Sequence, residues 1–366
     1  FIRLMQMLVV PLVFFSIADG CRNLGDTETL GKVGIRIVIF YMFTTALAIF
    51  ISLSLASLIG PGKGMNMSLG DQSFESVDTE ISLSDTILDF IPTNPIEALA
   101  TGNMIQIIIF AVLVGLLIAT MEDRLMTLGN IVTEMNDLMM GMTMWVMKLA
   151  PVGVFFLITR TFSSLGYDAI LSMLSYMASV LGGLVAQLII VYMLLITIFV
   201  RVNPFKFLKK FAPVMTFGFS TASSSATVPI HIQTLDDMGV DKKISSFTIP
   251  LGATINMDGT AIMQGVAVIF IANAYGIDLT ASDFMTVILT ATIASVGTAG
   301  IPSVGLITLS MVLESVGLPV EGIAIIMGID RILDMARTTV NLTGDATGTM
   351  IVANSVGAFD KEKFNR

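Results

Sequence analysis

The chain has 366 residues, of which 54% are hydrophobic and only 13% are charged. A soluble globular domain usually has about 25% charged residues, and the mean hydropathy here is +0.87. This composition excludes a disordered chain, and the net charge of −9 argues against a nucleic-acid partner, which would need a basic surface. It predicts a polytopic α-helical membrane protein.

Five apolar runs in the first half of the chain are predicted membrane spans, because about 20 apolar residues are needed to cross the hydrocarbon core. They cover residues 1–18 (the end of a span), 33–59, 105–120, 128–157 and 170–200. Lysine and arginine cluster in segments that the positive-inside rule assigns to the cytoplasm, namely residues 22–36, 201–210, 242–243 and 361–366. The acidic segment 71–89 then lies outside, and the chain is predicted to be a multi-pass protein of the cell inner (plasma) membrane.

After residue 201 the apolar stretches become shorter and are broken by small and polar residues. Two such breaks, 220–225 and 295–302, are too polar to face lipid and are predicted to be the tips of re-entrant hairpins. The spans that follow them carry Asn256 with Asp258, and Asn341 with Asp345. Two copies of this arrangement are typical of inverted-repeat transporters, whose binding site lies near the middle of the membrane.

The last span carries a polar stripe, formed by Asp330, Asp334, Arg337, Asn341 and Asp345. Their spacing of 4, 3, 4 and 4 residues places them within a stripe of roughly 80° on one helical face. Each ionised group at the bilayer centre costs roughly 2.5–3.5 kcal/mol, so the stripe needs partners or ligands. Arg337 suits a carboxylate and Asp334 an ammonium, while the backbone N–H groups at the hairpin ends suit a second carboxylate. The predicted substrate is an amino acid with an acidic side chain.

A second polar group is predicted to bind a hard cation. Asp258, Asp345, Asn256 and Asn341 offer carboxylate and amide oxygens and no soft ligand. Bound cations would also reduce the repulsion between these acids and an anionic substrate, so ion coupling is expected on physical grounds.

Three other interpretations are open. Asp330 and Arg331 are candidates for a purely structural ion pair. Two intramembrane aspartates are also typical of intramembrane aspartyl proteases, although Arg337 would favour the ionised form of Asp345 and so oppose a shared proton. An anion channel would not need the pair of Asp334 and Arg337.

Four motifs together resemble the dicarboxylate/amino acid:cation symporter family, which is the glutamate transporter family. They are Ser223-Ser224-Ser225, Asn256-Met257-Asp258-Gly259-Thr260, the tip at residues 295–302, and Asp334-Met335-Ala336-Arg337-Thr338-Thr339-Val340-Asn341. The resemblance covers the whole chain and places the first span of the family outside this sequence. It implies an all-α polytopic inverted-repeat transporter with two re-entrant helical hairpins and broken helices, assembled as a homotrimer in the lipid bilayer, and no organic cofactor or catalytic residue.

The resemblance also implies the roles of individual residues. The substrate-binding positions are Ser224, Val296, Gly300, Thr260, Asp334, Arg337, Thr338 and Asn341. Sodium would bind at one site formed by Asp345 with the carbonyls of Gly252, Asn256 and Asn341, and at a second formed by the carbonyls of Thr254, Ser295, Val296 and Thr298. A third sodium site would use Tyr41, Thr44, Thr45, Asn256 and Asp258.

The implied activity is symport of L-glutamate or L-aspartate with sodium ions by an elevator movement; proton-coupled symport of the same substrates, or symport of C4-dicarboxylates, is the alternative. Asp334 disfavours the C4-dicarboxylate branch and Arg337 the neutral amino-acid branch.

The resemblance divides the chain into a scaffold span (1–32), a transport-domain span (33–60), an extracellular loop with the start of a scaffold helix (61–100), scaffold and trimerisation spans (101–160), a transport-domain span (161–202), re-entrant hairpin 1 (203–242), a broken span (243–278), re-entrant hairpin 2 as the gate (279–317), a final span with the substrate site (318–358) and a cytoplasmic tail (359–366).

Overall fold

The computed structural model describes residues 4, 7–8, 10–11, 14–15, 18–19, 22, 28–65, 91–102, 104–149, 152, 156, 171–295 and 304–366. Apart from one isolated bridge between Val240 and Phe359, the secondary structure of these residues is helical. The predicted all-α class is therefore confirmed. The tip of the second hairpin, at residues 296–303, lies outside the described residues.

The first half of the chain forms four long helices that overlap predicted spans and a short one, α4, that lies between two of them. The bounds are α2 (Glu28–Ile59), α4 (Pro95–Thr101), α5 (Met104–Thr120), α6 (Glu122–Met147) and a helix at Leu171–Val200. Helix α6 begins six residues before the predicted fourth span and follows α5 after Met121 alone. The helix at Leu171–Val200 contains two π-helical turns, η1 (Gln187–Tyr192) and η2 (Ile196–Val200), separated by the short α8 (Met193–Leu195).

The second half consists of shorter helices around one long one. The bounds are α9 (Pro204–Thr221), α10 (Ser224–Asp237), α11 (Lys242–Ile255), α12 (Asp258–Tyr275), α13 (Ala281–Ser295), α14 (Val304–Ser315), η3 (Val320–Gly322), α15 (Ile323–Ser355) and α16 (Lys361–Asn365). The polar break in the first hairpin lies where α9 ends with Ala222 in the left-handed conformation (φ 50°) and Ser223 caps α10. The spans that follow the two hairpins differ in one respect. The first is broken between α11 and α12, at Asn256 and Met257, whereas the second is the continuous helix α15.

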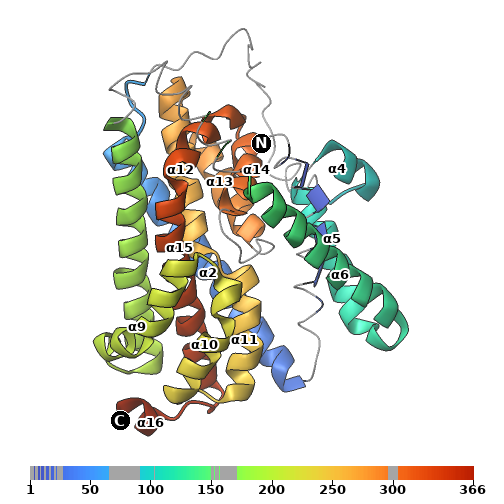
Figure 1. The fold of residues 1–366 in the computed structure, drawn as a ribbon, viewed down its shortest axis with the longest axis vertical. Coiled ribbons are helices and arrows are strands. Elements are labelled where there is room, and N and C mark those ends of the chain that lie inside the picture. Colours follow the sequence, from blue (N-terminus) through green and yellow to red (C-terminus); the bar gives the residue numbers. More distant parts are fainter. Residues whose placement is uncertain are drawn as a thin grey trace.

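Helix α12 forms the centre of the core. Almost all of its residues are buried, and it packs against α2, α13, α14 and α15. A helix that is apolar on all sides is stable only when it is surrounded by protein or lipid. In Figure 1 this bundle stands beside a separate limb made of α4, α5 and α6.

The outer surface of the helices carries large apolar side chains. The helix at Leu171–Val200 exposes a row of them: Leu171, Leu174, Leu181, Val185, Ile189, Ile190, Leu194, Ile198 and Phe199. Among the described residues, three helices are long and apolar enough to cross a membrane, at Lys32–Ile59, Leu171–Val200 and Lys242–Tyr275. Such a surface suits lipid rather than water.

The basic segments predicted to be cytoplasmic lie together at one end of the bundle. Arg36 of α2 donates to Ser355 at the end of α15, and Lys206 of α9 donates to the carbonyl of Asn365. Lys363 pairs with Asp236 of α10 at 3.0 Å. The chain end, α16, packs at this end of the molecule, which is the lower end in Figure 1.

Candidate functional site

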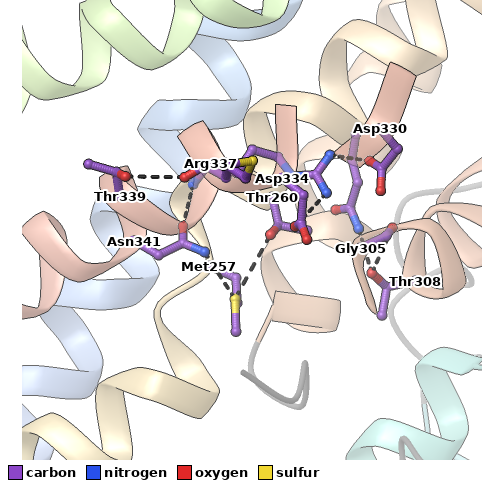
Figure 2. Close-up of polar contacts among 12 residues, drawn as sticks. Met257, Thr260, Gly305, Thr308, Asp330, Asp334, Arg337, Thr339 and Asn341 are labelled. Atoms are coloured by element: carbon purple, nitrogen blue, oxygen red, sulfur yellow. Dashed lines mark hydrogen bonds and ion pairs between the residues drawn. The ribbon is translucent and has the colours of Figure 1, made fainter. Parts of the chain in front are cut away.

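A buried ion cluster occupies the predicted stripe on α15. Nη1 of Arg337 donates to Oδ1 of Asp330 at 2.6 Å, and Nη2 donates to Oδ1 of Asp334 at 2.8 Å (Figure 2). Arg337 is 1% exposed, and its Nε has no hydrogen-bond partner among the described residues. The structural pair of Asp330 with Arg331 is therefore wrong: Asp330 pairs with Arg337, and Arg331 is exposed.

The second hairpin packs closely over this cluster. A Cβ atom at Gly305 of α14 would lie 2.7 Å from Cγ2 of Thr260 and 3.8 Å from Nη2 of Arg337. Gln264 of α12 donates to Thr308 of α14 at 2.8 Å, which ties the two helices together. The start of α14 therefore covers the guanidinium group, as Figure 2 shows.

The broken span joins α15 through Asn341. Its Oδ1 accepts from the backbone N–H of Gly259 at 2.7 Å, and its Nδ2 donates to the sulfur of Met257. The hydroxyl of Thr260 contacts the same sulfur. Figure 2 shows Thr260 and Asn341 directed at this sulfur.

The remaining substrate-binding candidates are only partly described. Thr338 is buried on α15, and Ser224 is buried at the start of α10. Val296 and Gly300 lie outside the described residues. No hydrogen bond among the described residues joins Ser224 to the cluster at Arg337, so its role there stays a prediction.

Asp345 forms a second buried group with the end of α11. Nδ2 of Asn256 donates to Oδ1 of Asp345 at 2.8 Å and to the carbonyl of Asn341 at 3.0 Å. A Cβ atom at Gly252 would lie 2.4 Å from Oδ1 of Asp345 and 2.6 Å from the Tyr41 hydroxyl, so only glycine allows this approach. Oδ2 of Asp345 and Oδ1 of Asn256 are buried without a hydrogen-bond partner in the described part of the chain.

Asp258 lies in a third buried group, at the start of α12. Its Oδ1 accepts from Thr45 at 2.6 Å, and its Oδ2 accepts from Gln187 at 2.9 Å and from Tyr192 at 2.7 Å. Gln187 also donates to the carbonyl of Thr44 at 3.3 Å. Sequence reasoning missed both Gln187 and Tyr192; the signal was two hydrogen-bonding side chains inside an otherwise apolar run.

Only part of the predicted second sodium site lies among the described residues. Val296 and Thr298 lie outside the described residues. Thr254 is the penultimate residue of α11, and its hydroxyl donates to the carbonyl of Leu251. Ser295 is the last residue of α13, and its hydroxyl donates to the carbonyl of Thr292. The structure thus brings together the residues around Asp345 and around Asp258, and the second sodium site stays a prediction.

The charge balance of the described interior is strongly negative. Four aspartates are buried, at positions 258, 330, 334 and 345, against Arg337 as the only buried lysine or arginine of the described residues. In that part of the chain, no three His, Cys, Asp or Glu side chains converge as a metal cluster. A cation bound here would therefore depend on single carboxylates with amide, hydroxyl and carbonyl oxygens, which suit a hard ion.

These features define a class of protein: a multi-pass helical membrane transporter with broken helices and buried charges at its centre. The profile of the sodium:dicarboxylate symporter family matches residues 1–355, and the chain belongs to this family. It is therefore a symporter of the cell membrane and not an enzyme, so the protease interpretation is wrong. The geometry agrees, because Asp258 is bonded to neutral donors rather than to a second carboxylate.

Three relatives illustrate the similarity. A proton/sodium-glutamate symport protein of Bacillus caldotenax is 35% identical over 99% of this chain and 88% of its own length. A proton/glutamate-aspartate symporter of Escherichia coli (strain K12) is 35% identical over 99% of this chain and 85% of its own. Excitatory amino acid transporter 3 of Mus musculus is 33% identical over 96% of this chain and 77% of its own.

Proposed function

We propose that the protein is a secondary symporter of the acidic amino acids L-glutamate and L-aspartate, driven by sodium ions. The observation that carries the proposal is the excess of buried carboxylates over the single buried arginine among the described residues. An acidic amino acid brings two carboxylates and one ammonium, which adds further negative charge. Because an unpaired buried charge costs several kcal/mol, substrate and cations are expected to enter together.

The substrate is proposed to bind beside Arg337. The guanidinium has five N–H donors, two of which are used on Asp330 and Asp334. The unpartnered Nε and the remaining N–H groups are proposed to hold the side-chain carboxylate, and Asp334 to accept from the ammonium. Thr260, Thr338 and Asn341, together with Ser224 and the tip residues Val296 and Gly300, are proposed to complete the pocket.

Sodium is proposed to bind at Asp345 and at Asp258. Buried oxygens of Asp345 and Asn256 that have no partner among the described residues support this proposal, since a cation would satisfy them. Proton coupling is the second candidate, because two relatives carry proton in their names. Under that reading the same aspartates would carry the protons.

An elevator movement and a homotrimer are also proposed. In Figure 1 the limb of α5 and α6 stands apart from the bundle that holds the buried charges, which suits a static scaffold beside a moving domain. Both helices expose large apolar side chains, among them Leu113, Leu117, Ile131, Leu138 and Trp145. Native mass spectrometry should give a trimer, and a monomer would contradict the assembly.

Uptake into proteoliposomes tests the proposed function. Labelled L-aspartate and L-glutamate are offered under an inward sodium gradient and, separately, under an inward proton gradient, with labelled succinate as the C4-dicarboxylate comparison. We expect uptake of both amino acids with the sodium gradient and little uptake of succinate. Uptake driven only by protons would show that the coupling ion is the proton and not sodium. Preferred uptake of succinate would contradict the substrate assignment.

A further inference from the structure

The carboxylate of Asp258 is held from two sides by different helices. Thr45 of α2 donates to Oδ1, whereas Gln187 and Tyr192 of the helix at Leu171–Val200 both donate to Oδ2. All four of these side chains are fully buried. An ionised carboxyl group has about four acceptor positions, two on each oxygen. The two donors therefore fill Oδ2, whereas Oδ1 is the oxygen that bonds α2.

A π-helical turn explains how two residues of one helix reach the same oxygen. Gln187 and Tyr192 are the first and last residues of η1, in which the N–H of Met193 bonds the carbonyl of Leu188 five residues earlier. Residues five apart in an α-helix point about 140° away from each other, since a turn takes 3.6 residues. The wider turn instead brings residue i+5 close to residue i on the same side. Single π-turns inside helices are frequent at functional sites.

Gln187 also connects the carboxylate to its surroundings. Its Nε2 donates both to Oδ2 of Asp258 and to the carbonyl of Thr44, which is 3.3 Å away. Its Oε1 is buried without a hydrogen-bond partner in the described part of the chain. A buried acceptor without a donor indicates that a group outside the described residues satisfies it.

We infer that Gln187 and Tyr192 are positioning residues for the cation site at Asp258: bonded together to Oδ2, they fix the carboxylate so that Oδ1 faces the oxygens of α2. The inference rests on the proposed function, in which Asp258 binds a coupling ion. Cation affinity and the choice between cations of different size then depend on the helix at Leu171–Val200. The resemblance to the family assigns no cation ligand to this helix.

Cation-dependent thermal unfolding of the purified protein, without substrate, tests this inference independently of transport. The unfolding temperature is followed against sodium and against lithium concentration, and the midpoint concentration of each ion is obtained. For Tyr192→Phe we expect the sodium midpoint to rise about tenfold, the effect of losing one hydrogen bond to a charged group. The ratio of lithium to sodium midpoints should also change, because a carboxylate that can rotate discriminates less by ion size.

Tyr176→Phe is the matched control. Tyr176 lies on the same helix, is fully buried, and has a hydroxyl with no hydrogen-bond partner among the described residues. It should keep the wild-type midpoints, whatever its effect on the unfolding temperature itself. Gln187→Met, which keeps the side-chain length and removes the donor, should behave as Tyr192→Phe does and serves if that variant fails to fold.

Wild-type midpoints and ratio in both Tyr192→Phe and Gln187→Met would overturn the inference. Equal changes in Tyr192→Phe and Tyr176→Phe would overturn it as well, because the effect would then follow any lost buried hydroxyl. If the wild-type protein shows no cation-dependent stabilisation, the proposed cation coupling fails, and the inference fails with it.

Discussion

The protein has two buried charged regions, and they differ in how the negative charge of their aspartates is balanced. At Arg337, two aspartates share one guanidinium, so their charge is partly neutralised within α15 itself. At Asp258 and Asp345, the hydrogen-bond partners among the described residues are neutral donors only. The first region is partly balanced without an ion, whereas a bound cation would balance the second. This difference supports the proposal that the first region recognises the substrate and the second couples the ion.

Removing the guanidinium should have the largest effect. Arg337→Ala leaves Asp330 and Asp334 buried without their cation, and breaking a buried pair typically costs about 3–5 kcal/mol. We expect uptake of acidic amino acids to fall by about 100-fold or more and uptake of neutral amino acids to rise. Labelled uptake into proteoliposomes measures both.

The control for this change is Arg331→Ala on the same helix. Arg331 is exposed, so uptake should stay near the wild-type rate. Acidic uptake that survives in Arg337→Ala would remove the pocket assignment. Arg337→Lys, which keeps the charge but loses the fork, is a second variant in case the alanine variant does not fold.

Neutralising the second region should affect the ion rather than the substrate pocket. Asp345→Asn replaces the carboxylate that accepts from Asn256 with an uncharged amide of similar shape. We expect the sodium concentration for half-maximal uptake to rise by about tenfold or more, at an unchanged preference for acidic over neutral amino acids. Asp278→Asn, on the exposed surface, should leave sodium dependence unchanged. A normal sodium dependence in Asp345→Asn would contradict the comparison.

A smaller effect is expected from crowding the second region without changing its charge. Gly252→Ala would place a Cβ atom 2.4 Å from Oδ1 of Asp345, so the carboxylate and the Tyr41 hydroxyl must move apart. The sodium midpoint should rise several-fold. Gly141→Ala is the control, since nothing lies within 4 Å of a Cβ atom at that position of α6. Equal midpoints in the two variants would show that the geometry around Gly252 does not matter for the ion.

The smallest effect concerns the contact between α12 and α14. Thr308→Val keeps the side-chain shape and removes the hydrogen bond to Gln264. The free energy of unfolding should fall by about 1–3 kcal/mol, because Gln264 is left unpaired in a buried position, while the sodium midpoint stays the same. Thr216→Val, on the exposed face of α9, should change the free energy of unfolding by no more than about 0.5 kcal/mol. It should leave the sodium midpoint unchanged. A changed sodium midpoint in Thr308→Val would mean that the two regions are not separate.

The sequence predicted much of this arrangement because its signals are local. The 3.6-residue period placed the polar stripe on one face of α15, and polar interruptions located the break at Ala222 and Ser223. The alternative that pairs Asp330 with Arg331 is wrong because adjacent helical residues point in different directions, while residues seven apart share a face. Gln187 and Tyr192 were not found, since a π-turn has no sequence period and two polar side chains in an apolar run resemble ordinary packing.

The central claim is that substrate binding requires a cation because the interior is too negative without one. The most direct test is the affinity of the purified protein for L-aspartate, measured by calorimetry at fixed pH over a range of sodium concentrations, with choline replacing sodium. We predict that affinity rises steeply with sodium and is very weak in choline. An affinity for L-aspartate that is the same in choline as in sodium would contradict the claim.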